Sequence, residues 1–94
     1  MNSSEIIKIN RLQNSLDTVN SVIDSLKDEY EKLRIYRQEL SDNWTSDSSE
    51  LYLSRLDKQI SDLSVCIGNA EGIYSKLKNH IDNQTDNLKN INML

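Results

Sequence analysis

Proline is missing from this sequence, and glycine, cysteine and aromatic residues are scarce. The 94 residues include no phenylalanine, two glycines, one cysteine and one tryptophan. A proline-free chain rich in Leu, Ile, Lys, Glu and Asp suits long helices and suits sheets badly. Apolar residues make up only 36% of the chain, so they must gather on a narrow stripe to form a core.

Clusters of positive charge and long apolar runs are missing as well. Lysines and arginines are scattered singly along a chain of net charge −4, which excludes the basic patch of a nucleic-acid-binding protein and disfavours an anionic membrane surface. No apolar run approaches the roughly 18 residues of a membrane span. The segment 1–5 lacks the features of a secretory signal peptide. We therefore expect no membrane insertion and no Sec-dependent export.

Signatures of catalysis and of cofactor binding do not occur in the sequence. It contains no phosphate-binding loop, nucleophile elbow or zinc-ligand spacing. His80 is the only histidine, and Cys66, the only cysteine, lies about four helical turns away from it. We expect no enzyme activity, no metal site and no cofactor, and we interpret Cys66 as a small apolar residue.

Apolar residues recur with alternating spacings of three and four in two long stretches. The first stretch consists of Ile9, Leu12, Leu16, Val19, Ile23, Leu26, Tyr30, Leu33 and Leu40. The second consists of Leu53, Leu56, Ile60, Leu63, Ile67, Ala70, Tyr74, Leu77 and Ile81. Arg37 interrupts the first register and Gln84 the second, which resumes at Leu88 and Ile91. Heptads sustained over this length are typical of helices that pair along a shared seam.

The segment 41–49 separates the two registers and is dense in Ser, Asp and Asn, whose side chains compete for backbone hydrogen bonds. Asp47 and Glu50 have the spacing of a capping box that opens a helix. We predict one helix over about 3–41, a turn over about 42–47 and a second helix over about 48–90. Each helix would be on the order of 60 Å long. The asparagine-rich C-terminal end is expected to fray.

A short connection makes two such helices antiparallel neighbours, so the predicted fold is an all-α, two-helix hairpin. The alternative is one continuous helix, which the polar segment and the break in register argue against. In an antiparallel pair the heptad positions e face each other along one edge and the positions g along the other.

The two edges differ in polarity. With the turn near Thr45, the e edge pairs Arg34 with Asp57, Lys27 with Ser64, Asn20 with Glu71, and Gln13 with Lys78. The g edge pairs Tyr36 with Tyr52, Val22 with Cys66, and Ser15 with Ile73. We call the first the charged edge and the second the apolar edge.

A lone hairpin has too little interior to cover an apolar edge, and exposed apolar stripes commonly mark partner surfaces. We therefore expect the apolar edge to dock onto another helical pair and form a four-helix bundle. In the alternative interpretation, its residues only widen the seam inside the hairpin.

The predicted turn carries Trp44-Thr45-Ser46 at the midpoint of the chain, with Tyr52 eight positions after the tryptophan. A tryptophan at the turn of a helical hairpin, followed two positions later by a tiny residue, resembles the WXG family of small type VII secretion proteins (the ESAT family). The resemblance covers essentially the whole chain. Ser46 stands where the family usually has glycine, which indicates that the turn can form without a residue at positive φ, since non-glycine residues rarely adopt it.

The resemblance implies a role in secretion. Many members carry a Y-x-x-x-D/E export signal after the second helix, but here Tyr74 is followed by Lys78 and Tyr52 by Leu56. The chain would then leave the cytoplasm, to be secreted or held in the cell envelope, with a partner that carries a signal or by a tail of another type. Such hairpins in Gram-positive bacteria accompany larger LXG-type toxins and bind their helical N-terminal regions, or form WXG-like dimers. The alternative function is a structural coiled-coil segment of a larger assembly unrelated to secretion.

Two features have two interpretations each. Trp44 either caps the hairpin by folding against Leu40, Leu51 and Leu53, or presents its ring to a partner, as interface tryptophans do. Gly68 and Gly72 either weaken the outer face of the second helix or form a smooth patch that another helix approaches closely.

Overall fold

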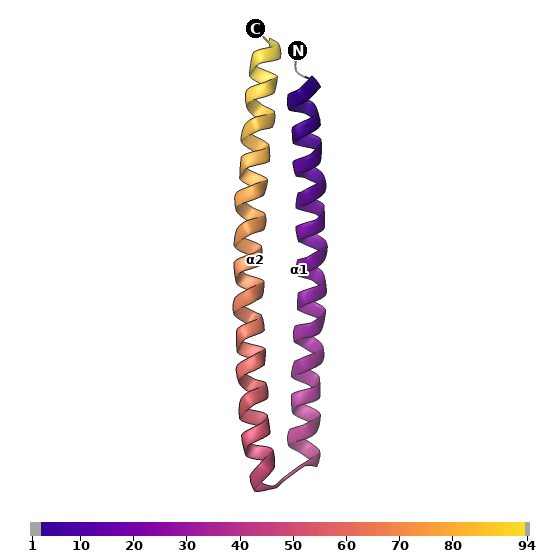
Figure 1. The fold of residues 1–94 in the computed structure, drawn as a ribbon, viewed down its shortest axis with the longest axis vertical. Helices are drawn as coiled ribbons and strands as arrows, with labels where there is room; N and C mark the ends of the chain where they lie inside the picture. The colour runs from indigo at the N-terminus through magenta and orange to yellow at the C-terminus, as the bar shows by residue number, and fades with distance from the viewer. Residues whose placement is uncertain (1–2, 94) are drawn as a thin grey trace.

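Two long helices lie side by side and antiparallel in the computed structural model, which describes residues 3–93 (Figure 1). Helix α1 spans Ser3–Asn43 and helix α2 spans Asp47–Met93. Together they form a rod 72 Å long and 15 Å wide. The chain reverses once, and the ends of the two helices meet at the opposite end of the rod, which we call the open end (Figure 1).

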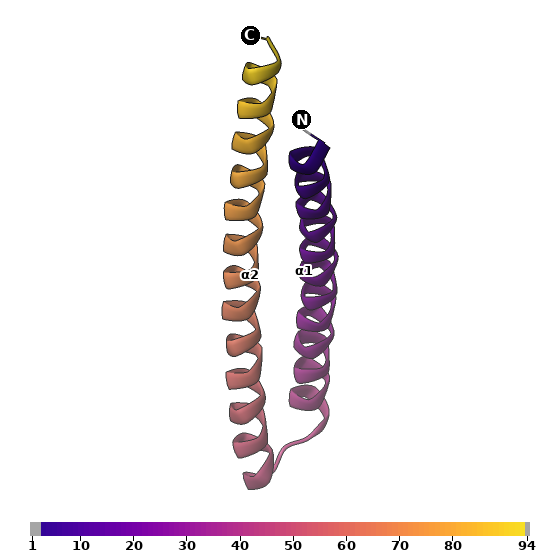
Figure 2. The ribbon, with the colours of Figure 1, turned by 45° about the horizontal axis from the view of Figure 1, so that its top comes forward.

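The predicted hairpin is therefore confirmed, with small corrections to its boundaries. The turn comprises residues 44–46, which is shorter than predicted, because α1 continues to Asn43 and α2 begins at Asp47. The asparagine-rich segment continues α2 to Met93, past the predicted end near residue 90. At the open end α2 extends beyond α1 (Figure 2). Fraying of this end concerns motion in solution and stays a prediction.

The core is a single seam between the helices, as the heptads predict. Its most buried members come from both registers and are 4–8% exposed: Leu16, Ile23, Leu56, Ile67 and Ile81. No large side chain in the described part of the chain is completely enclosed. Each helix therefore buries one stripe and leaves most of its surface in solvent, as two helices without a third layer must.

The seam departs from the predicted register near the open end. Gln84 is exposed, whereas Thr85, half-buried, turns its hydroxyl back to the Ile81 carbonyl at 2.8 Å. Leu88 is half-buried, but Ile91 remains 57% exposed. Burying the Gln84 amide in an apolar interface without a hydrogen-bond partner would be unfavourable. The helix instead turns Thr85 toward the seam, where the Ile81 carbonyl accepts the hydrogen bond of its hydroxyl.

Neither helix, over the residues described, contains a stretch long and apolar enough to cross a bilayer.

Truncation of the seam tests this packing. We expect Ile23→Ala to lower the free energy of unfolding by about 2–4 kcal/mol, because it removes buried methyl groups and leaves a cavity. Val65→Ala is the matched control, since Val65 is 61% exposed and its truncation should cost well under about 1 kcal/mol. Thermal and urea unfolding followed by circular dichroism measures both. Equal losses in the two variants would contradict the seam.

Substitution of the two glycines of α2 should stabilise the chain, in contrast to truncation of the seam. A methyl group at Gly68 or Gly72 would meet no atom within 4 Å, and both residues have helical φ. Gly68→Ala and Gly72→Ala should each stabilise the chain by about 0.5–1 kcal/mol, because alanine loses less backbone entropy in a helix. A lower melting temperature in either variant would show that another group occupies this face.

Candidate functional site

Ser46 organises the start of α2. Its hydroxyl accepts a hydrogen bond from the Ser49 amide at 3.2 Å, and its own amide donates to the Ser49 hydroxyl at 2.9 Å. This is the reciprocal geometry of a capping box, with serine at both positions. Ser49 is only 3% exposed and also donates to the Ser46 carbonyl at 2.7 Å.

The predicted capping box of Asp47 and Glu50 is therefore wrong by one residue. Asp47 is already the first helical residue, and an N-cap residue precedes the helix. The side chain that accepts a hydrogen bond from a first-turn amide is therefore that of Ser46. No residue among those described has positive φ, so the turn forms without the left-handed conformation that favours glycine. Ser46 thus supplies the side-chain cap of α2.

Trp44 lies in the turn with its ring against Tyr52, at a centroid distance of 5.7 Å and an interplanar angle of 52°. Its amide closes the last turn of α1 by donating to the Leu40 carbonyl at 2.9 Å. The indole nevertheless remains 38% exposed. The ring of Trp44 therefore lies against Tyr52, and Leu51, one of its three predicted neighbours, is 58% exposed. Presentation of the ring to a partner stays a prediction.

Tyr36 and Tyr52 face each other across the apolar edge near the turn, which confirms that predicted pair. A side-chain hydrogen bond with Tyr52, together with the charge of a neighbouring phenolate, raises the pKa of Tyr36. The two rings are 44% and 43% exposed. With Trp44 they form an aromatic group at the turn end, which we call the aromatic tip.

The middle of the apolar edge is exposed and apolar. Val22 is 50% exposed, Ile73 is 59% exposed, and Cys66 is an exposed free thiol. The structure therefore places these residues outside the seam, against the interpretation that they widen it. Val65, next to Cys66 in sequence and 61% exposed, lies at the outer f position of its heptad and not on this edge. The predicted pairings of Val22 with Cys66 and of Ser15 with Ile73 stay predictions.

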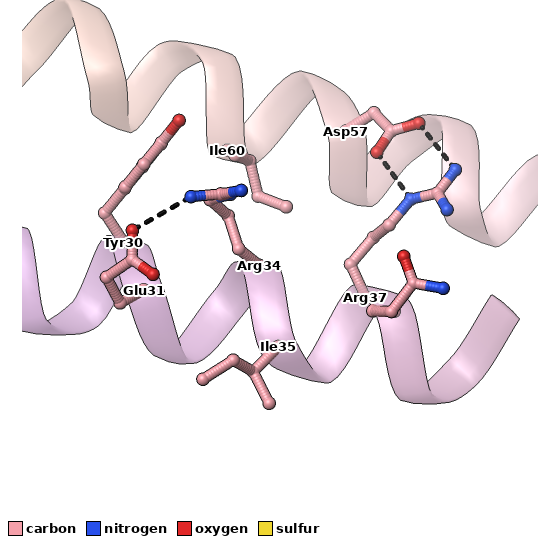
Figure 3. Close-up of a pocket in the computed structure, with 8 residues that line it drawn as sticks. Tyr30, Glu31, Arg34, Ile35, Arg37, Asp57 and Ile60 are labelled. Atoms are coloured by element: carbon pink, nitrogen blue, oxygen red, sulfur yellow. Dashed lines mark hydrogen bonds and ion pairs between the residues drawn. The ribbon is translucent and has the colours of Figure 1, made fainter. Parts of the chain in front are cut away.

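The opposite edge carries the ion pairs that cross between the helices. Arg37 donates from Nε and Nη2 to the two carboxylate oxygens of Asp57, at 2.8 and 3.1 Å (Figure 3). Lys27 Nζ lies 3.4 Å from a carboxylate oxygen of Glu71. A bidentate arginine–carboxylate pair fixes both distance and orientation, so it ties α1 to α2 at a defined register.

These partners correct the predicted pairs on the charged edge. Arg34 pairs with Glu31 of its own helix at 3.0 Å, not with Asp57 (Figure 3). Lys27 reaches Glu71 instead of the uncharged Ser64. A long cationic side chain can lean along its helix toward a carboxylate. It therefore forms an ion pair with that carboxylate and not with the residue directly opposite. Arg37, which interrupts the heptad, supplies the pair that the pattern assigned to Arg34.

A shallow hollow of about 390 Å³ lies beside these residues, between Tyr30, Arg34, Asp57 and Ile60 (Figure 3). The Arg34 guanidinium stands 5.8 Å from the centre of the Tyr30 ring. Both arginines at the hollow already face carboxylates, so it offers no free positive charge to an anionic ligand.

A second hollow, of about 270 Å³, lies between the helices at the open end. Its apolar lining comes from Ile9, Leu12, Leu88 and Ile91, and its polar lining from Glu5, Lys8, His80, Gln84 and Asn87. Lys8, His80 and Asn87 occupy g positions, so this open-end groove faces the same side as the apolar edge. Sequence reasoning missed it, although Glu5 and Gln84 at seam positions are the signal of a loosened seam.

No group of three or more His, Cys, Asp and Glu residues within the described range could hold a metal ion. His80 lines the open-end groove, while its neighbour Asp82 pairs with Lys78 at 3.0 Å. The aromatic tip, Val22 and Ile73 expose aromatic and aliphatic side chains, which suit contact with another protein surface.

Comparison with known protein families, curated proteins and solved structures finds no match to this chain. The functional argument therefore depends on the fold and on the surface described above.

The pair between Arg37 and Asp57 predicts a pH effect. Hydrogen bonding from Arg37, more than its charge, lowers the pKa of Asp57 in the folded chain. The stabilisation is complete above the ordinary carboxyl pKa of about 4 and is lost as the pH falls through the lowered value. Asp57→Asn should therefore reduce the loss of melting temperature between about pH 6 and pH 2.

The matched control is Asp62→Asn, whose carboxylate pairs with Lys58 of the same helix at 2.9 Å and does not join α1 to α2. Its pH profile should stay closer to that of the unaltered chain, because local exposed pairs contribute little. A profile for Asp57→Asn that matches the unaltered chain would contradict the role of the cross-helix pair.

Proposed function

We propose that this chain is a helical interaction protein that docks onto another pair of helices through its apolar edge. The carrying observation is the contrast between its two edges. One edge satisfies its charges internally, with Arg37 on Asp57 and Lys27 on Glu71. The other leaves apolar side chains in solvent, with Val22 50% and Ile73 59% exposed. Water contact with such a stripe is unfavourable, so burial against a partner is favourable.

We further propose that the setting is a type VII secretion system, with the chain acting as the export companion of a larger LXG-type toxin or as a WXG-like dimer. The support is the resemblance of Trp44-Thr45-Ser46 to the WXG tripeptide, together with the location of Trp44 in the turn of a two-helix hairpin. Since the sequence after the turn has no Y-x-x-x-D/E signal, the proposed export uses a partner that carries one or a tail of another type.

Binding to a toxin region tests the proposed docking. We expect co-expression with the helical N-terminal region of an LXG toxin from the same genome to yield a stable complex. Val22→Glu combined with Ile73→Glu should weaken it by roughly 30-fold or more, since a charge at the centre of an apolar interface costs about 2 kcal/mol or more. Titration by calorimetry measures the affinity.

The control for this experiment is Ser25→Glu, a charge of the same sign on the outer face of α1, where the Ser25 hydroxyl donates to the Ser21 carbonyl. It should bind as the unaltered chain does, and circular dichroism should show all variants equally helical. Equal affinity of the double variant and the control would refute docking through the apolar edge. Secretion that persists without the type VII ATPase would refute the secretion role and favour a structural coiled-coil segment.

A further inference from the structure

The net charge of the chain is concentrated at the turn end of the rod (Figure 1). Segment 38–54, which surrounds the turn, contains no lysine or arginine and four acidic residues, which we call the tip carboxylates: Glu39, Asp42, Asp47 and Glu50. Without these four, the 15 acidic residues of the chain are reduced to 11, which equals its 11 lysines and arginines. The whole net charge of −4 therefore belongs to the turn end, and the rest of the rod is neutral in sum.

The chain itself does not neutralise the tip carboxylates. The ion pairs within residues 3–93 join other residues, and none of them includes one of the four. Arg37, the nearest basic residue on α1, already donates to both carboxylate oxygens of Asp57. Arg55, the nearest basic residue on α2, lies outside the segment and is counted in the neutral remainder. The turn end therefore presents uncompensated negative charge.

Helix stability accounts for only two of the tip carboxylates. Asp47 and Glu50 lie in the first turn of α2, where the helix dipole favours negative charge. Asp42 lies in the last turn of α1 and Glu39 directly before it, and there the dipole disfavours negative charge. That last turn also lacks a basic residue. A charge that is unfavourable for its own helix is explained if a binding partner uses it.

Exposed aromatic rings occupy the same end of the rod. Trp44 lies in the turn, Tyr36 on α1 and Tyr52 on α2, and the three residues are 38–44% exposed. Glu39 lies one helical turn from Tyr36 and so on the same side of α1. Ring faces attract cations, and Arg34 stands over a tyrosine ring in this way farther along α1. Within residues 3–93, no cation of the chain covers a ring of the aromatic tip.

We propose that the aromatic tip and the tip carboxylates bind an arginine-bearing segment of another protein. Its guanidinium groups stack on the exposed rings and pair with the carboxylates, those of Glu39 and Asp42 above all. Arginine suits this surface better than lysine, because its planar group stacks on aromatic faces and donates paired hydrogen bonds to carboxylates. The inference goes beyond the proposed function, because it adds a second surface and does not depend on docking through the middle of the apolar edge.

The sign of the charge selects a protein partner. Exposed aromatic rings also contact nucleic-acid bases and membrane interfaces in other proteins. The phosphates of a nucleic acid or of an anionic lipid surface would be repelled by the tip carboxylates. A basic segment is instead attracted to the turn end within a Debye length, about 8–10 Å at physiological salt. Because the rest of the rod is neutral in sum, it competes little for such a segment.

Titration with a basic peptide tests the tip directly. The probe is a short peptide in which arginine alternates with alanine, labelled for fluorescence anisotropy and unlabelled for emission measurements. Trp44 is the only tryptophan, so a change in its emission reports contact at the tip. We expect saturable binding that changes this emission and weakens as salt is added. Binding that leaves the Trp44 emission unchanged would overturn the proposal.

Two double variants of equal charge separate the tip from the chain as a whole. Glu39→Gln with Asp42→Asn should raise the dissociation constant of the peptide roughly fivefold, because two exposed ion pairs are lost. Asp24→Asn with Asp28→Asn is the control and should bind within about twofold of the unaltered chain. Its positions lie about 24 Å or more from Trp44 along α1, which exceeds the Debye length. Equal weakening of both variants would overturn a site at the tip.

A change of the tryptophan tests the rings. Trp44→Leu keeps an apolar side chain but removes the ring, and should raise the dissociation constant measured by anisotropy roughly threefold, while Trp44→Phe restores part of the affinity. Unchanged affinity of Trp44→Leu would overturn the role of the rings. Val22→Glu with Ile73→Glu, which tests the proposed function, keeps the tip and should bind the peptide at least as tightly as the unaltered chain. Failure of one proposal is therefore distinguishable from failure of the other.

Discussion

Two helices that share a single seam can bury only one stripe of each, and this constraint governs the surface of the hairpin. The stripe here consists of apolar residues spaced by three and four, of which Ile23 and Leu56 are among the most buried. No third layer covers the flanks of the seam in a single copy. Whatever lies at the flanking heptad positions is therefore exposed, and its chemistry decides how the molecule meets other proteins.

The two flanks of the seam differ in polarity. On the charged edge, the bidentate pair of Arg37 with Asp57 holds α1 and α2 in register and satisfies its own polar groups. On the apolar edge, Tyr36 and Tyr52 meet near the turn, and Val22 remains half exposed. The first edge thus sets the alignment of the helices, and the second offers apolar area whose burial stabilises a complex. A substitution on the apolar edge should therefore leave the alignment of the helices largely unchanged, and one on the charged edge should leave the exposed apolar area largely unchanged.

Much of the fold could be predicted from the sequence, because heptad spacing specifies both the helices and the face that each one buries. The break at segment 41–49 located the turn to within a few residues. The cap was misplaced by one residue, because Ser46 and Ser49 form the reciprocal hydrogen bonds of a capping box, with serine where glutamate or glutamine is usual. The apolar edge was also predictable, because polarity at the g positions is visible in the sequence.

Two other features were not predictable from heptad positions. The partner of Asp57 depends on how far the Arg37 side chain leans along its helix, which a position-by-position pairing does not represent. The open-end groove depends on how the seam relaxes around Glu5 and Gln84, where polar residues occupy seam positions. Long side chains and local relaxation act in three dimensions, whereas the heptad describes only the direction in which each residue points.

The central claim is that the chain doubles back at residues 44–46 and so creates two edges. Spin labels at Asn14 of α1 and Asn79 of α2, introduced as cysteines with Cys66→Ser, report this directly by their separation. The hairpin predicts a distance within about 25 Å, since packed helices have axes about 8–10 Å apart. One continuous helix would separate the same labels by on the order of 100 Å at 1.5 Å per residue, and that result would contradict the account.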